Sequence, residues 1–281
     1  EKNEMNISEK TILSSSNNNL TLIIRTPVFA PKGIIQINTG TCIPQKIYWK
    51  FADYLCQNGY VAITYDYGNS ENFSSSVKHE DWLKDMECVS QFVLENYSNL
   101  KKYIVGHSSG GQLIGYTPSA ALFDKLFLVA STNGYIGYLP FYMRIVLILF
   151  WKIIVSYSLW KYGYMNNEAF GTKGGFPKNI ILELRQWCLT KDFFVSYYKT
   201  TGIQSHYNSI KIPVKSYHLA DDKITTRDGC QFILDLYSNA QKEIETLHAN
   251  DYGIKKFGHR GFFFASAEKK LWPKFLKDLE K

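Results

Sequence analysis

One short stretch of the sequence combines residue types that could perform nucleophilic catalysis. Ser108 lies in the run G-H-S-S-G-G (106–111), with glycines two positions before it and two positions after it. A stretch typical of a strand, 102–105, precedes this run, and a helical stretch, 112–116, follows it. A serine on such a tight strand-to-helix turn exposes its hydroxyl, and the glycines let the neighbouring backbone pass without a Cβ clash. The pattern predicts that Ser108 is a nucleophile.

A serine nucleophile needs a general base, which is usually histidine. Only one of the six histidines, His259, follows the last predicted strand, in the glycine-flanked loop 258–261. The others lie before the serine, in predicted strands or near a helical insertion: His79, His107, His206, His218 and His248. The sequence therefore predicts His259 as the base.

The base in turn needs an orienting carboxylate, which should follow the strand predicted at 213–219. Asp221 and Asp222 both stand at that position. Asp222 begins the run D-K-I-T-T, which resembles the pattern D-x-[IV]-x-P often found there. We prefer Asp222 as the acid and keep Asp221 as the alternative.

The negative oxygen that forms during acyl transfer needs two hydrogen-bond donors. The backbone N–H of Ser109, directly after the nucleophile, is expected to be one. The loop T-G-T (39–41), after the strand predicted at 33–38, is expected to supply the other.

These positions depend on an alternation of strands and helices along the chain. Residues 14–19 are expected to form a turn between two strands. Strands are predicted at 20–28, 33–38, 61–65, 102–105, 126–130, 213–219 and 243–249. Helices are predicted at 45–58, 81–97, 112–116, 232–237 and 262–279. The alternation predicts an α/β fold with a parallel sheet, whose ligand lies beyond the carboxyl ends of the strands.

The alternation is interrupted once. No clear strand occurs in residues 135–207, which are rich in aromatic residues and helical patterns. We expect residues 1–134 and 208–281 to form the core, and residues 135–207 to form a helical cap.

Composition excludes several classes of function. The net charge is +7, but Lys and Arg are spread among Asp and Glu, and no nucleic-acid-binding motif is present. The five cysteines lack metal-ligand spacing and indicate a reducing compartment, so we expect a cytoplasmic protein with no metal and no cofactor.

One apolar stretch, 138–160, needs a test for membrane insertion. Arg144 and Lys152 bracket its uninterrupted run, 145–151, whereas a spanning helix needs about 20 largely uncharged residues. The sequence favours a buried or interfacial amphipathic helix over a transmembrane span.

Together these motifs resemble the α/β-hydrolases, and in particular bacterial hydrolases related to serine aminopeptidases and monoglyceride lipases. The matching pieces span about residues 33–273: P-Q (44–45), Y-D-Y-G (65–68), G-H-S-S-G-G-Q (106–112), D-D (221–222), F-P (176–177) and G-H-x-G-F-F (258–263). The resemblance implies an α/β-hydrolase fold, with a mostly parallel eight-stranded sheet flanked by helices and a helical cap. It also places Thr41 at the donor position of the H-G-x loop, although the histidine usual there is absent. Two other departures do not touch the triad. Related sequences carry an arginine between the residues that match Tyr67 and Gly68, and an arginine where this sequence has Phe264.

The substrate is less well determined than the reaction. At least half of the cap aromatics are expected to pack the cap, and the rest favour a bulky hydrophobic ester: a lipid, an aryl ester or a macrolactone such as a macrolide antibiotic. The expected substrate contacts are Gly40, Tyr138, Tyr142, Trp151 and Trp187.

Two alternatives remain open. One is an aminopeptidase or amidase, which needs an acid to anchor a substrate ammonium group; Glu168 and Glu183 are candidates. The other is a non-catalytic module that binds a membrane surface through residues 144–160.

Overall fold

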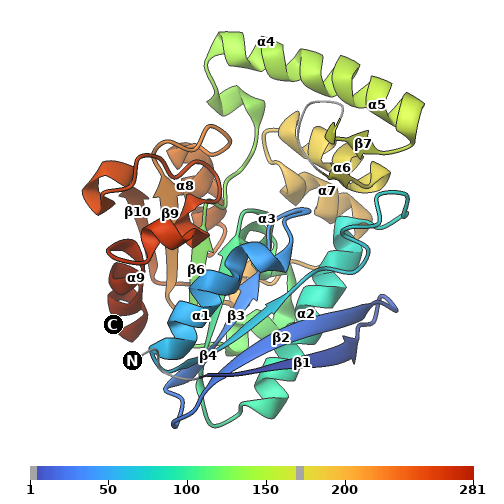
Figure 1. Ribbon diagram of the computed structural model, residues 1–281. Coiled ribbons are helices and arrows are strands. Elements are labelled where there is room, and N and C mark those ends of the chain that lie inside the picture. Colours follow the sequence, from blue (N-terminus) through green and yellow to red (C-terminus); the bar gives the residue numbers. More distant parts are fainter. Residues whose placement is uncertain (1–4, 169–173) are drawn as a thin grey trace.

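The computed structural model describes residues 5–168 and 174–281, and its centre is an eight-stranded sheet in the order β1-β2-β4-β3-β5-β6-β9-β10 (Figure 1). The strands are β1 (Met5–Leu13), β2 (Asn19–Pro27), β3 (Gly33–Asn38), β4 (Tyr60–Tyr65), β5 (Lys101–His107), β6 (Lys125–Val129), β9 (Val214–Leu219) and β10 (Lys242–Leu247). β2 pairs antiparallel with β1 and β4, whereas all other neighbours are parallel. The predicted mostly parallel, eight-stranded sheet is confirmed.

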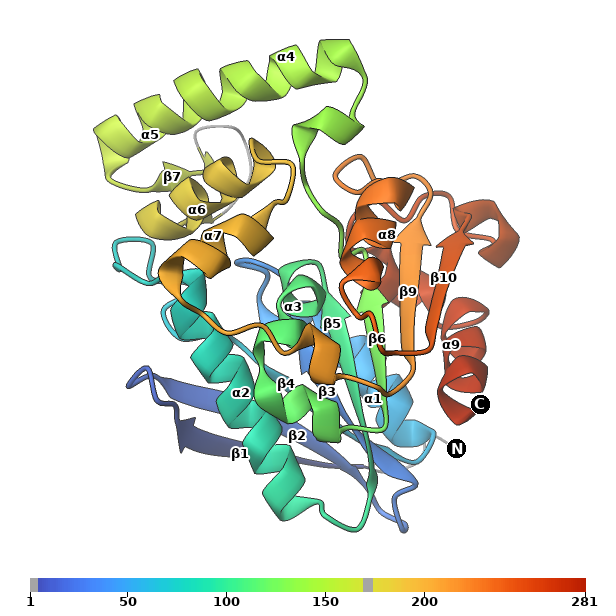
Figure 2. The same ribbon diagram turned by 180° about the vertical axis from the view of Figure 1, so that it is seen from behind.

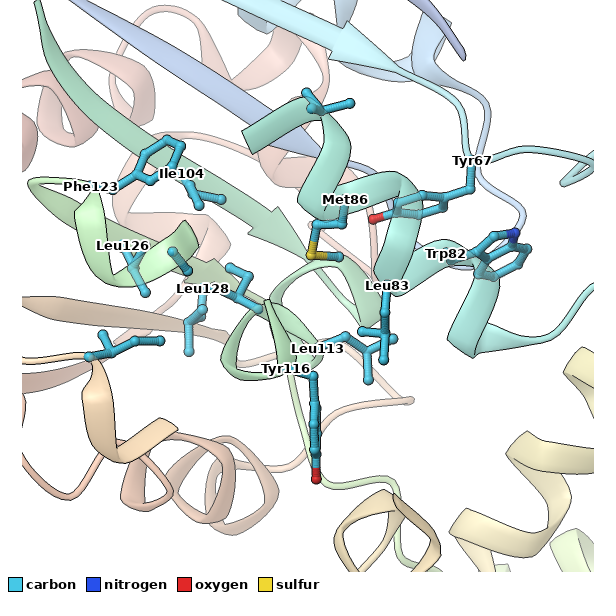
Figure 3. Packing of buried hydrophobic residues seen from close by; sticks show 14 of the residues in the cluster. Tyr67, Trp82, Leu83, Met86, Ile104, Leu113, Tyr116, Phe123, Leu126 and Leu128 are labelled. Atoms are coloured by element: carbon cyan, nitrogen blue, oxygen red, sulfur yellow. The ribbon is translucent and has the colours of Figure 1, made fainter. Parts of the chain in front are cut away.

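Helices cover both faces of this sheet. α1 (Trp49–Gln57) and α9 (Leu271–Glu280) share one apolar cluster with the strands, and α2 (His79–Asn96) and α8 (Arg227–Asp235) share the other. Figure 3 shows the second cluster, where Met86 of α2 packs near Leu113 and Leu128. β3 and β4 are buried along their whole length because they lie between the two helical layers.

Several predicted helices differ from the observed ones. The helix predicted at 112–116 is instead the end of a short helix, Ser109–Gln112, followed by a 3₁₀ turn, Ile114–Tyr116, and the first four residues of the helix predicted at 45–58 form a 3₁₀ turn.

α8 begins five residues earlier than expected, because the Thr226 side chain caps it by accepting a hydrogen bond from the Gly229 N–H. The helix expected at 262–279 is divided into two 3₁₀ turns (Gly261–Phe263 and Ala265–Ala267) followed by α9. Phe262 and Phe263 continue the apolar pattern because both are buried, and periodicity alone does not separate short turns from an α-helix.

A mainly helical segment lies between β6 and β9, above the carboxyl ends of the parallel strands (Figures 1 and 2). It contains the turn Ile136–Tyr138, α4 (Phe141–Leu149), α5 (Val155–Tyr162), the short strands β7 (Met165–Asn166) and β8 (Gly175–Phe176), α6 (Lys178–Cys188) and α7 (Phe194–Thr201). α4 and α5 form the outermost layer, with α6 and α7 between them and the sheet.

α4 and α5 are one continuous helix, because a π-helical turn (Phe150–Ile154) joins them. The resulting helix, Phe141–Tyr162, has 22 residues, its most apolar 18-residue window has a mean hydropathy of 1.6, and it is long and apolar enough to cross a membrane by length and composition alone. Arg144 and Lys152 lie within it rather than at its ends. The helix falls within the apolar stretch 138–160 apart from its last two residues. Only 17% of its most apolar window is buried, so it is not the buried helix that was one of the two expectations from the sequence.

Candidate active site

Ser108 occupies a strained turn between β5 and α3 (Ser109–Gln112). Its backbone has φ 53° and ψ −121°, in the region that side-chain-bearing residues rarely adopt. A Cβ on Gly106 would lie 2.4 Å from the Cα of Gly111, and one on Gly110 would lie 2.5 Å from the carbonyl oxygen of Asn38. The turn therefore requires both glycines of the motif.

His259 and Asp222 come together from two loops beyond the sheet. The Nδ1 of His259 is 2.7 Å from Oδ2 of Asp222, whose side chain is 1% exposed. Asp222 also accepts hydrogen bonds from the N–H of Ile224 and the hydroxyl of Thr225. Burial raises the pKa of Asp222, but these bonds, led by that from His259, outweigh it and hold the pKa below its usual value. Asp222 is thus kept as a carboxylate facing the imidazole.

Asp221, the alternative acid, has a different set of partners. Its two carboxylate oxygens accept hydrogen bonds from the backbone N–H groups of Phe257 and Gly258, at 2.8 and 2.9 Å. Gly258 has φ 54°, which glycine adopts without strain. Asp221 therefore holds the loop that carries His259, and Asp222 contacts the imidazole itself.

The loop after β3 lies against the turn of Ser108. A Cβ on Gly40 would be 3.3 Å from the Cβ of Ser108, so this loop passes close to the nucleophile. The Thr41 hydroxyl donates to Oγ of Ser109 at 2.8 Å, which ties together the two residues expected to supply oxyanion donors. The N–H of Gly40 donates instead to the Tyr48 hydroxyl. By contrast, the backbone N–H groups of Thr41 and Ser109 have no hydrogen-bond acceptor among the described residues.

Two further side chains, Tyr48 and His107, belong to this arrangement, although the sequence predicted a role at the site for neither: Tyr48 only matched the family resemblance, and His107 was expected to pack below the turn. The Tyr48 hydroxyl is 2.7 Å from Nδ1 of His107, and Nε2 of His107 is 2.8 Å from the carbonyl oxygen of His259. Both side chains are fully buried. The only available signal was that His107 adjoins the nucleophile at the end of a strand, where neighbouring side chains point to opposite faces.

The residues expected to contact substrate lie in different places. Gly40 is beside Ser108, as described above. Tyr138 is half-buried in the turn that follows β6. Tyr142 is 67% exposed on α4. For these residues a substrate contact stays a prediction.

The two tryptophans differ from the expectation. Trp187 of α6 is fully buried among aromatic rings that include His79, Phe193 and Phe194, so it joins the helical segment to the core. Trp151 is buried within the helical segment, against Val155 and its neighbours. Apolar size alone did not distinguish rings that hold this segment together from rings that line a pocket.

Two surface hollows lie away from Ser108. One, of about 480 Å³, is at the amino ends of the strands and is lined by residues such as Lys32 and Lys101. The other, of about 510 Å³, lies beside α7 and is lined by residues such as Tyr116 and Ile203. Within residues 5–168 and 174–281, no group of three or more His, Cys, Asp or Glu side chains could hold a metal ion.

Comparison with known proteins agrees with this arrangement. Residues 30–250 match the family model described as serine aminopeptidase, S33. A soluble variant of monoglyceride lipase from Saccharomyces cerevisiae, solved with a substrate analogue, superposes with a TM-score of 0.66 at 14% identity, over 100% of this chain and 96% of that one. A carboxyl esterase from Bacillus coagulans, solved with glycerol, gives 0.66 at 15% identity, over 99% of both chains. A brefeldin A esterase gives 0.60 at 14% identity, over 99% of this chain and 74% of that one. A search of curated proteins gave no match.

Proposed function

The chain belongs to the serine aminopeptidase (S33) family of α/β-hydrolases, and we propose that it cleaves carboxylic esters through an acyl-enzyme on Ser108. The observation that carries this proposal is the pairing of a strained serine turn with a buried histidine–carboxylate contact. Ser108 has φ 53°, and His259 lies 2.7 Å from Asp222. Strain of this kind persists where the surrounding structure enforces it, and a serine elbow with a base and an acid is the apparatus of acyl transfer.

In the proposed mechanism, the Ser108 oxygen attacks the ester carbonyl carbon while its proton passes to Nε2 of His259. Asp222 accepts the hydrogen bond from Nδ1, which fixes the tautomer and stabilises the imidazolium. The backbone N–H groups of Thr41 and Ser109 stabilise the negative oxygen.

The tetrahedral intermediate then collapses and expels the alcohol, which takes the proton from His259. The acyl group stays on Ser108 as an ester. Water then attacks the acyl carbon, with His259 again acting as base. This second step releases the acid and restores the serine hydroxyl.

The proposed substrate is an ester with a bulky hydrophobic group, either a lipid, an aryl ester or a macrolactone. Its support is the aromatic-rich helical segment above the carboxyl ends of the strands, where such a group would bind. Two structural neighbours, named as a monoglyceride lipase and a brefeldin A esterase, favour the same class of substrate by their names.

The positions of the candidate acids disfavour the aminopeptidase alternative. Glu183 is 6% exposed and already accepts hydrogen bonds from His79 and from the Tyr197 hydroxyl. Burial raises the pKa of Glu183, but the contacts with His79 outweigh it and lower the pKa. Glu168 is exposed on the surface. Neither carboxylate is free within a pocket to anchor a substrate ammonium group.

The non-catalytic alternative is disfavoured because a pure binding module has no need for a strained serine or a His–Asp pair.

The experiment that tests this proposal combines labelling with turnover. A fluorophosphonate should phosphonylate Ser108 with loss of fluoride, at a peptide identified by mass spectrometry. p-Nitrophenyl esters of rising chain length, lactones and aminoacyl amides should be compared as substrates. Ser108→Ala should abolish labelling and lower turnover by several orders of magnitude, since only binding and oxyanion stabilisation remain.

Ser205→Ala, at an exposed serine outside the site, is the matched control and should behave as wild type. Turnover near the wild-type rate in a folded Ser108→Ala protein would overturn the proposal. Faster cleavage of aminoacyl amides than of any ester would replace it with the peptidase alternative.

A further inference from the structure

The outer side of the helix Phe141–Tyr162 is an apolar surface with no protein against it. Seventeen large hydrophobic side chains are exposed in the described part of the chain, and eight of them lie in this one helix, from 44% to 80% exposed. They include Phe141, Ile145, Leu149, Ile153 and Trp160. The first four are spaced four residues apart and so lie along one side of the helix, which we call the outer face.

The opposite side of the same helix is already used. Trp151 and Val155 are buried there, in a cluster with Met165 and with Ile181 of α6. The helix is thus held on the protein by its inner side. The outer face contributes nothing to that packing, and apolar patches of this kind mark interaction sites in soluble proteins.

The charge around the outer face indicates what could bind it. Arg144, Lys152 and Lys161 are exposed on this helix, and residues 135–167 contain no Asp or Glu. The Lys161 ammonium lies over the rings of Tyr157 and Tyr162, at 5.7 and 5.1 Å from their centroids. An apolar stripe flanked by cations and by amphipathic aromatic rings is complementary to the headgroup region of an anionic bilayer.

The fold makes this helix lie on a bilayer rather than cross it. Both of its ends return to the same body: the turn Ile136–Tyr138 precedes it, and β7 follows it, paired with β8 (Figure 1). Lys152 is exposed near its middle, where a spanning helix would place a charge in hydrocarbon.

We propose that the outer face of helix 141–162 docks the protein on the surface of an anionic lipid bilayer, with the helix axis parallel to that surface. The outer face sinks into the headgroup region while Lys152 and Lys161 contact the lipid phosphates. Arg144 adds positive charge there, although its Nε and Nη2 already donate to the carbonyl oxygens of Leu139 and Gly137. This docking is independent of the proposed hydrolysis, since it involves no residue of the Ser108 site.

Co-sedimentation of the full chain with vesicles tests the proposal without any substrate. Vesicles of phosphatidylcholine alone should be compared with vesicles that contain an equal part of phosphatidylglycerol. We expect binding to the mixed vesicles to be tighter by roughly tenfold or more, and to weaken as salt is added. The double variant Lys152→Glu, Lys161→Glu should lose that advantage. The double variant Leu149→Ser, Ile153→Ser should weaken binding to both kinds of vesicle.

Leu122→Ser is the matched control, because Leu122 is 68% exposed but lies just before β6, at the amino ends of the strands. It should bind as wild type. Brominated lipids should quench part of the tryptophan fluorescence, and Trp160→Phe should remove that quenching. Equal binding to both vesicles, or unchanged binding by Leu149→Ser, Ile153→Ser, would overturn the proposal. If the wild-type protein self-associates in analytical ultracentrifugation and the Leu149→Ser, Ile153→Ser variant does not, the outer face binds a second copy of the chain instead.

Discussion

The imidazole of His107 is hydrogen-bonded through Nε2 to the backbone carbonyl oxygen of His259, at 2.8 Å. A carbonyl only accepts, so Nε2 carries the proton and Nδ1 accepts from the Tyr48 hydroxyl, 2.7 Å away. The Tyr48 oxygen in turn accepts from the N–H of Gly40. A continuous chain of hydrogen bonds therefore joins the loop of the proposed base to the loop of the proposed oxyanion donor.

Tyr48→Phe should lower kcat while leaving KM nearly unchanged. The ring still packs against Phe263, but the N–H of Gly40 loses its acceptor and His107 loses its donor. An unpaired buried polar group costs about 1–3 kcal/mol, and this cost should displace the loops that carry Gly40 and His259. Turnover should therefore slow by roughly tenfold to a hundredfold. Steady-state kinetics on a p-nitrophenyl ester measure this effect.

Tyr54→Phe, on the helix α1 that begins directly after Tyr48, is the control, since the Tyr54 ring packs on Trp272 and lies outside this chain of hydrogen bonds. It should keep the wild-type kcat. If Tyr48→Phe raised KM and left kcat unchanged, Tyr48 would act on substrate binding and not on the position of the two loops.

His107→Gln should flatten the acid dependence of stability. Burial and the nearby His259 lower the pKa of His107 from 6.5 to about 3. Between these values the unfolded chain binds a proton that the folded chain does not, so stability falls as the pH drops below 6.5. The slope from one such group is at most about 1.4 kcal/mol per pH unit.

Glutamine keeps an N–H donor for the His259 carbonyl but does not titrate. Urea unfolding at a series of pH values from neutral to 4 should therefore give a smaller slope for His107→Gln than for the wild type. An unchanged slope would mean that other groups account for the loss of stability in acid.

Asp222→Asn and Asp221→Asn should fail in different ways. Asp222→Asn removes the charge that faces His259 and allows the wrong tautomer, which should lower kcat by roughly 10³- to 10⁴-fold, as for the corresponding change in serine proteases. Asp221→Asn leaves that contact in place but keeps only one acceptor for the two N–H groups of Phe257 and Gly258. It should cost about 1–2 kcal/mol of stability with a small loss of kcat. A larger loss of kcat in Asp221→Asn would reverse the two roles.

The sequence predicted the parts of this protein that depend on local pattern. The buried strands, the glycines around Ser108 and the position of His259 after the last strand all follow from spacing and chain order. The preference for Asp222 over Asp221 needed a family pattern, because two adjacent carboxylates on one loop have no distinguishing periodicity.

Contacts between distant segments could not be predicted in this way. Tyr48 and His107 are 59 residues apart, and His107 and His259 are 152 apart, so no local pattern links them. The same limit applies to Trp187, whose apolar side chain is equally compatible with a pocket and with the packing of α6 on the core. The sequence likewise could not predict which side of helix 141–162 becomes the outer face, because that depends on which of its two apolar sides packs against the rest of the protein.

Tyr138 and Trp187 offer the test of whether the helical segment sets substrate size. Tyr138 is half-buried in the turn after β6, with its ring centroid 5.8 Å from that of Tyr135, and burial and the nearby carboxylates of Asp228 and Asp192 raise its pKa. If that ring contacts the bulky part of an ester, Tyr138→Ala should lower kcat/KM for long-chain esters roughly tenfold more than for acetate. Trp187→Ala should instead cost about 3–5 kcal/mol of stability and affect short and long esters equally, because it opens a cavity between α6 and the core. Equal losses on both esters in Tyr138→Ala would assign this ring, too, to packing.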